Sequence, residues 1–433
     1  MALTTSSQFA SSIAVGSDWR DTSKAVLEEL ESILTEGADF NIGFIYVSDY
    51  LAKDMESILG LFRSVLKIDN WLGTVGMGVC GNGVEYIDRP AISAMIGHID
   101  DDDLCLFSPQ DNDVSHDSLE PGAPGAHDQD DMAAWLKTNQ PMLVLAHGDP
   151  TNEEDPAEAL QNLAHKTQGF VAGGLSSSRA EHYQIAGAHL CQGGLSGAVF
   201  SANIAVSTAL SQGCRPLGPY HRITSGEEHY ISTLDEQRAI DVFEQDIREI
   251  VMQRAGASAE KILSGKADIH GDKPDEDFNT LFKGEVHAAI PVKGSDQDDY
   301  LVRNLIGIDP ESGTIGVSET IAPNDQIMFV HRDDETLCAD LSKTLVNLRQ
   351  RVTKEHGSFA PKAAVYVSCV ARGFNNFMSG APELESNDGS SNINEMKLVH
   401  EVIGDVPLAG FYASGEISNA RLYGYTGVLI LFL

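Results

Sequence analysis

The sequence predicts an α/β protein of mixed α+β type, with two domains of mixed β-sheets flanked by helices. Apolar runs of strand length alternate with amphipathic helical segments along most of the chain. Both halves also contain consecutive strands without an intervening helix, which favours mixed rather than purely parallel sheets. A strand–helix–glycine-rich-strand pattern occurs three times, as in proteins built from repeated units.

The three copies of this pattern share a glycine at the same place in the second strand, at Gly73, Gly173 and Gly410. A further strand follows each copy and is expected to pair with it. Strand–helix–strand arrangements are common, so a chance match is the alternative. The segments are 42–49, 51–66 and 71–78 with 91–97; 142–149, 155–165 and 170–176 with 195–200; and 363–367, 393–403 and 407–417 with 425–433.

The order of these segments predicts an N-terminal extension and helix at 1–37, a first domain at 38–238 and a second at 239–433. Residues 1–20 are polar and are expected to be frayed or loosely docked. The stretch 194–231 is interpreted as a meander of consecutive strands. The second domain is expected to begin with strands at 286–331, continue with a helix at 333–352 and end with the third copy.

Composition excludes several classes of function. The formal net charge is −35, which disfavours nucleic acid and anionic membranes as partners. No apolar run approaches the ~20 residues that cross a bilayer, and the first residues lack a secretory pattern. The six cysteines show no CxxC pair, so a reduced, cytoplasmic protein is the simplest interpretation. The acidic runs lack the spacing of a calcium loop and are interpreted as solvated surface.

The chain resembles a known family at two sets of residues. Cys369-x-x-Arg372-Gly373, Glu395, Pro407-x-x-Gly410-Phe411 and Gly415-Glu416-Ile417 resemble the FIST C-terminal domain. A second set of residues resembles the FIST N-terminal domain. It consists of Gly73, residues 169–174, the strand pair 197–210, residues 212–218, residues 224–226 and a helix that begins at 234–236. The resemblance covers roughly residues 38–420.

The resemblance implies a sensory module for a small ligand, with amino acids or their derivatives as the proposed ligands. Some bacterial members resemble nitric-oxide-sensing haem proteins, so haem is a further cofactor to consider. The sequence contains no attached F-box, kinase or methyl-accepting segment. The resemblance therefore implies that a separate partner protein carries the signal.

A ligand site is predicted where the strands of the third copy end. Arginine pairs with carboxylate or phosphate groups, and a glutamate can receive an amine, so Arg372 and Glu416 match the two ends of an amino acid. A structural salt bridge from Arg372 to Glu395 or Glu416 is the alternative. The predicted ligand-binding residues are Cys369, Arg372, Gly373, Tyr412, Ser414 and Glu416.

Two further residues are candidates for a catalytic nucleophile and for a haem ligand. Cys369 could be a nucleophile, but no histidine is near it in sequence, and a buried inert thiol is the favoured interpretation. His147 ends a strand, opposite Ser48 and Ser368 of the other copies, and is a weak candidate for a haem ligand. No catalytic residue and no metal site is predicted.

The function expected from the sequence is that of a cytoplasmic sensory protein that binds a small ligand and signals through a partner protein. The alternatives are a haem-dependent sensor of nitric oxide and an enzyme that uses Cys369 or the Arg372–Glu416 pair. No cofactor is predicted. The third copy could pair with the first within one chain or across a homodimer.

Overall fold

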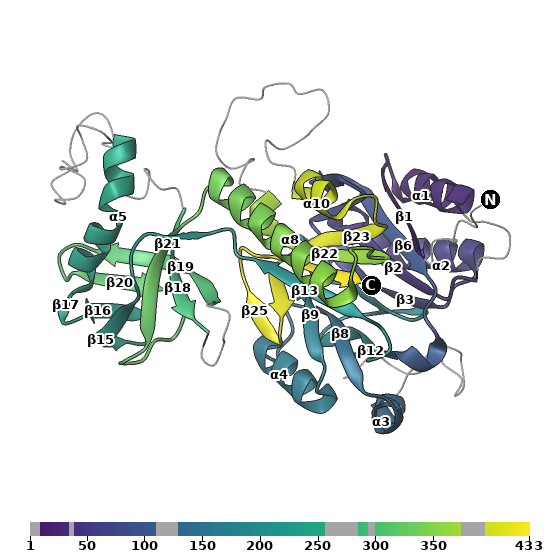
Figure 1. The fold of residues 1–433 in the computed structure, drawn as a ribbon, viewed down its shortest axis with the longest axis horizontal. Coiled ribbons are helices and arrows are strands. Elements are labelled where there is room, and N and C mark those ends of the chain that lie inside the picture. Colours follow the sequence, from purple (N-terminus) through teal and green to yellow (C-terminus); the bar gives the residue numbers. More distant parts are fainter. Residues whose placement is uncertain (1–8, 34–38, 110–128, 256–284, 293–298, 374–394) are drawn as a thin grey trace. The chain divides into compact units, whose positions relative to one another are not determined.

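The computed structural model describes residues 9–33, 39–109, 129–255, 285–292, 299–373 and 395–433 (Figure 1). The chain forms two compact units: residues 1–212 together with 340–433, and residues 213–339. The expected boundary at residues 238 and 239 falls inside the second unit, because strands before it pair with strands after it. The expected features at 1–8, 34–38 and 257–284 lie outside the described residues.

The first unit contains three six-stranded mixed sheets. The first sheet has the order β1 (Phe9–Val15), β6 (Ala91–Gly97), β2 (Ile42–Ser48), β3 (Asn70–Gly76), β10 (Gln184–Ala186) and β11 (His189–Cys191). The second has the order β7 (Leu104–Phe107), β12 (Leu195–Ser201), β8 (Pro141–Gly148), β9 (Phe170–Leu175), β24 (Gly415–Ser418) and β25 (Arg421–Tyr423). The third has the order β13 (Val206–Ser211), β26 (Gly427–Phe432), β22 (Ala363–Cys369), β23 (Leu408–Ala413), β4 (Gly78–Gly81) and β5 (Val84–Ile87).

The three sheets have the same internal arrangement. In each, the first strand of a copy pairs in parallel with the second and antiparallel with the strand that follows the copy. Gly73, Gly173 and Gly410 lie at the same place, each opposite a residue of the parallel neighbour. A Cβ atom at these glycines would come within 1.8, 1.9 and 2.0 Å of that neighbour's carbonyl oxygen. Only glycine fits there, which is why the sequence shows it three times.

A hairpin follows the second strand of each copy and joins the sheet of a different copy. The β4–β5 hairpin of the first copy pairs with β23 of the third. The β10–β11 hairpin of the second copy pairs with β3 of the first, and the β24–β25 hairpin of the third pairs with β9 of the second. The first and third copies therefore pair within one chain, and the exchange is cyclic.

Helices cover the outer face of each sheet, and the inner faces share one core. The inner core contains Phe44, Leu145 and Val365 from the central strands of the three sheets. The helices of the first, second and third sheets pack in three separate clusters on the outside. They are α1 (Trp19–Ile33) and α2 (Met55–Leu66); α3 (Gln129–Thr138) and α4 (Pro156–Thr167); and α8 (Asp334–His356) and α10 (Glu395–Ile403).

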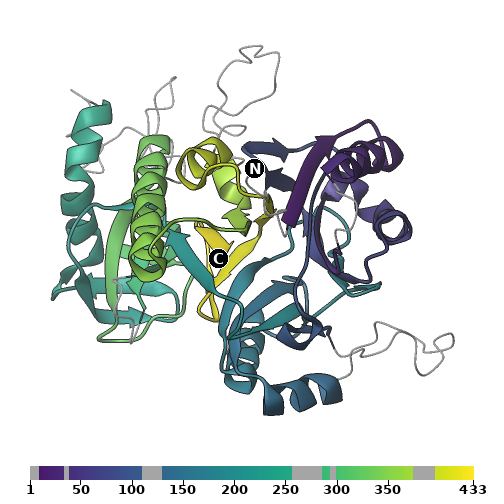
Figure 2. The same cartoon turned by 45° about the vertical axis from the view of Figure 1, so that its right-hand side comes forward.

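The expectation of a frayed N-terminus is wrong for residues 9–15. They form β1, which pairs along its whole length with β6 and lies beside α1 (Figure 2). The serines made this segment look polar. Two of them are buried and satisfied: the Ser11 hydroxyl donates to Asn82 Oδ1 at 2.6 Å, and the Ser12 hydroxyl donates to Glu29 Oε2 at 2.6 Å.

The predicted meander at 194–231 is wrong in its first part, although the strands at 221–227 and 230–234 do pair with each other. β12 and β13 are consecutive but belong to different sheets, where β12 pairs with β7 and β8, and β13 pairs with β26. The later strands belong to the second unit. Hairpin-like spacing alone could not distinguish a turn from a crossing between sheets.

The second unit is a sheet that closes on itself, covered by the helix α5 (Ala239–Ala255). Closure comes from the pairing of β21 with both β15 and β18. Its strands are β14 (Arg215–Pro216), β15 (His221–Glu227), β16 (Tyr230–Leu234), β17 (Gln237–Arg238), β18 (Val286–Pro291), β19 (Tyr300–Asp309), β20 (Thr314–Val317) and β21 (Gln326–His331). Among the described helices of both units, none is long and apolar enough to cross a membrane.

Candidate functional site

The predicted site residues meet at the carboxyl ends of β22 and β23. These strands are parallel, and Cys369 pairs with Ala413 at their last position. Arg372 follows β22, Ser414 connects β23 to β24, and Glu416 lies in β24. Strand ends of this kind place side chains from several elements at one edge of a sheet.

Arg372 is bound to Glu395 and not to Glu416. Its Nε donates to Glu395 Oε1 at 2.6 Å, and the two side chains are 0% and 3% exposed. A second nitrogen, Nη1, donates to the carbonyl oxygen of Ser211 at 3.0 Å. Burial alone would lower the pKa of Arg372, but the nearby Glu395 charge raises it above its usual range. The guanidinium is therefore charged and fully enclosed.

Glu395 receives two further hydrogen bonds at its other oxygen. The hydroxyls of Tyr366 and Ser368 each donate to Oε2 at 2.8 Å. Glu395 is the first residue of α10, whereas its donors belong to β22 and to the helical residues directly after it. The sequence resemblance included Glu395, but the site prediction left it out, because no local pattern connects it with residues 366–372.

Glu416 has a different set of partners. Its side chain is completely buried, and Oε2 accepts hydrogen bonds from the Thr426 backbone at 2.9 Å and from the Thr426 hydroxyl at 2.8 Å. Oε1 has no hydrogen-bond partner among the described residues. Burial raises the pKa of Glu416 to about 7, although Thr426, Arg372 and the Cys369 thiol act in the opposite direction. This carboxyl can gain or lose its proton near neutral pH.

The remaining predicted residues are held in separate contacts. The Tyr412 hydroxyl donates to Glu85 Oε2 at 2.8 Å, from the face of β23 that packs against α10. Gly373 lies against the same ring, because a Cβ atom there would come within 2.9 Å of it. Ser414 is exposed, and its hydroxyl donates to the carbonyl oxygen of Ser176 at 2.7 Å.

His147 lies in the inner core, on β8 of the second sheet, far in sequence from the predicted ligand-binding residues at 369–416. The ring is completely buried, with Nε2 3.3 Å from the Tyr46 hydroxyl and its centroid 5.8 Å from that of Phe411. Burial lowers the pKa of His147 to about 3, so the ring is neutral. When the three copies are aligned on their glycines, His147 occupies the position equivalent to Tyr46 and Val367. The expected equivalents were Ser48 and Ser368.

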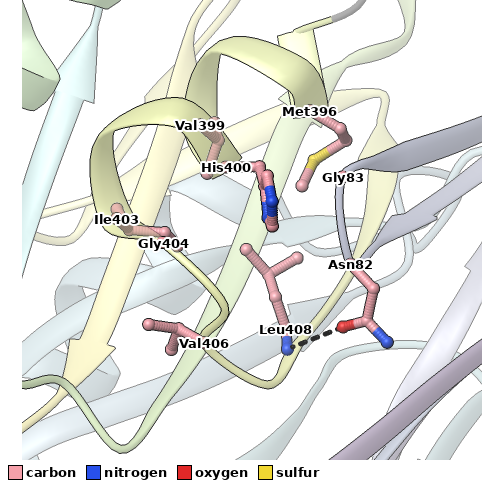
Figure 3. A pocket seen from close by; sticks show the side chains of 9 residues that line it. All are labelled: Asn82, Gly83, Met396, Val399, His400, Ile403, Gly404, Val406 and Leu408. Atoms are coloured by element: carbon pink, nitrogen blue, oxygen red, sulfur yellow. Dashed lines mark hydrogen bonds between the residues drawn. The ribbon is translucent and has the colours of Figure 1, made fainter.

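A small cleft lies between α10 and the turn that connects β4 and β5 (Figure 3), and none of the predicted site residues lines it. One wall is the apolar side of α10, and Leu408 forms the floor together with Asn82. Its lining residues are Asn82, Gly83, Met396, Val399, His400, Ile403, Gly404, Val406 and Leu408. Within the described ranges, no group of three histidine, cysteine or acidic side chains is arranged to hold a metal ion.

Comparisons with known proteins agree with the resemblance seen in the sequence. The model of the FIST N domain matches residues 41–237, and that of the FIST C domain matches residues 239–419. The uncharacterized proteins MT0656 of Mycobacterium tuberculosis (strain CDC 1551 / Oshkosh) and Mb0898c of Mycobacterium bovis are each 28% identical to it over about half of both chains, 52% of this one and 50% of theirs. The chain thus spans about half the length of the curated relatives that it matches. Because the two family models together match nearly the whole sequence, the chain belongs to the FIST family.

Proposed function

We propose that this protein is a cytoplasmic sensor that binds a small ligand, such as an amino acid or a derivative, and signals through a separate partner protein. FIST domains are associated with sensory and signal-transduction proteins. The ligand site is formed by Cys369, Arg372, Gly373, Tyr412, Ser414 and Glu416. The protein acts as a binding module, and no catalytic step is assigned to it.

One observation carries this proposal. A guanidinium and two carboxyl groups, those of Arg372, Glu395 and Glu416, are buried together at the same strand ends. Burying charged groups is costly even when they are paired, and functional sites are where such groups with shifted pKa values cluster. Glu416 also keeps one oxygen without a hydrogen bond in the described structure. An ammonium group of a ligand would supply the missing donor.

The test is a thermal-shift screen of the purified full chain against amino acids and their carboxylate derivatives, followed by calorimetry. At least one zwitterion should raise the melting temperature. Glu416→Gln should then weaken its binding about tenfold, because a charged hydrogen bond becomes a neutral one. An analogue that lacks the amine should bind the variant and the native protein alike.

A matched control is Glu319→Gln, which removes a partly exposed charge, paired with Arg303, from the second unit. This variant should bind the zwitterion with unchanged affinity. Equal affinities for all three proteins, or no stabilising compound in the screen, would contradict the proposal. Arg372→Ala is unsuitable here, because it leaves Glu395 charged and unpaired and should destabilise the fold by about 3–5 kcal/mol.

A further inference from the structure

We infer that Arg372, Tyr366 and Ser368 form a carboxylate-binding site which the chain's own Glu395 fills, and that a ligand carboxylate binds by taking the place of Glu395. The inference deepens the proposed sensory function and rests on it for the identity of the ligand. It assigns the ligand class, a small carboxylate, and the residue that competes with it.

The geometry is that of a complete receptor for one carboxylate. Arg372 Nε binds one oxygen at 2.6 Å, and the hydroxyls of Tyr366 and Ser368 bind the other at 2.8 Å each. All three donors are buried, so they are shielded from water and bind an anion strongly. The site selects for a carboxylate because it offers one cation and three converging donors.

The receptor and its occupant belong to different elements. Tyr366 and Ser368 lie in β22, the central strand of the third sheet, and Arg372 is also held by the Ser211 carbonyl. The sheet therefore holds the backbone of Tyr366 and Ser368, and Arg372 keeps a second partner besides Glu395. Glu395 instead begins α10, a helix of nine residues at the edge of the cleft in Figure 3. An exchange of the carboxylate therefore requires a shift of α10.

Such an exchange provides a signal. A ligand that displaces Glu395 changes the position of α10, which packs through Met396, Val399 and Ile403 against the third sheet. The occupied and exchanged states differ in one short helix, whereas the site itself stays the same. Because Glu395 competes with the ligand, the apparent affinity is lower than that of the empty site.

The test is chemical rescue of Glu395→Ala with sodium acetate, which matches the deleted carboxylate. The variant should melt below the native protein, and acetate should raise its melting temperature saturably by about 2–4 °C. Sodium chloride at equal ionic strength and acetamide, the neutral analogue, should have no such effect. If the variant does not fold in plain buffer, its refolding yield with and without acetate provides the same comparison.

The matched control is Arg372→Ala/Glu395→Ala, which removes the receptor cation as well and should not respond saturably to acetate. A lack of rescue of the single variant, or equal rescue of both, would overturn the inference. Acetate needs no knowledge of the natural ligand. If acetate rescues the variant but no compound binds the native protein, only the sensory function is contradicted. If a zwitterion binds the native protein but acetate does not rescue the variant, only the exchange is contradicted.

Discussion

Glu395 and Glu416 are both buried at the same strand ends, yet their surroundings differ. Glu395 is paired with a guanidinium through one oxygen and accepts two hydroxyl hydrogen bonds at the other. Glu416 accepts hydrogen bonds only at one oxygen, and burial raises its pKa to about 7. The same residue type therefore has both carboxyl oxygens hydrogen-bonded at one position and only one of them at the other.

This difference predicts a pH dependence that belongs to Glu416. Because the pKa of the folded state exceeds the ordinary value of 4.5, the native state holds the proton more tightly than the unfolded state. The stabilisation is fully present below pH 4.5 and is lost as the pH rises through 7. Glu416→Gln cannot titrate. Its free energy of unfolding, relative to the native protein, should be higher at pH 8 than at pH 5 by up to ~3 kcal/mol.

Urea unfolding of both proteins at the two pH values measures this difference. Glu319→Gln serves as a control, since that carboxylate is partly exposed and bound to Arg303. A difference between Glu416→Gln and the native protein that is the same at pH 5 and pH 8 would show that Glu416 is not protonated in the folded state.

At the scale of elements, the parallel strand pairs depend on one glycine each. β3, β9 and β23 approach their partners so closely at Gly73, Gly173 and Gly410 that a Cβ atom would meet a backbone oxygen at 2.0 Å or less. A flexible side chain can move away, but the backbone of a central strand cannot. The glycines therefore determine how each sheet is assembled.

Gly173→Ala should lower the free energy of unfolding by at least ~3 kcal/mol, because β8 and β9 must separate to admit the methyl group. The comparison is Gly60→Ala in α2, where no atom lies within 4 Å of the new methyl group. That change should stabilise the protein by about 0.5–1 kcal/mol, since alanine favours the helix. Similar urea midpoints for the two variants would contradict the proposed role of Gly173.

At the scale of the whole molecule, the first unit is discontinuous in sequence. The second unit lies between Gln212 and Asp340, and the two ends of the first unit meet there. The Ser211 hydroxyl donates to Asp340 Oδ2 at 2.8 Å. A chain that leaves and returns at neighbouring points is typical of an inserted domain.

Replacing residues 213–339 by a short glycine–serine linker should therefore leave a folded first unit. The three exchanged hairpins connect its sheets, so it should unfold in a single cooperative transition. Circular dichroism and urea unfolding of the shortened protein would check this. A shortened chain without a cooperative transition would show that the first unit needs the second in order to fold.

Local patterns in the sequence predicted the fold class and the family, together with most strands and helices of the three copies. This was possible because buried strands and amphipathic helices have characteristic periods. The three glycines could also be recognised in the sequence, because a position that admits no Cβ atom is occupied by glycine in every copy. The sequence placed Cys369, Arg372 and Glu416 at one edge of the third sheet, and the structure does bring these three residues together there. That they bind a ligand stays a prediction.

Partner choice was decided only by the tertiary structure. The sequence contains Ser211, Glu395 and Glu416, but only the fold assigns the first two to Arg372 and pairs Glu416 with Thr426. The exchange of hairpins, the pairing of β1 and the insertion of the second unit are decided in the same way. Each depends on contacts between residues far apart in the chain. Local periodicity and propensity do not determine which distant residue pairs with a buried charge or which distant strand pairs with a sheet edge.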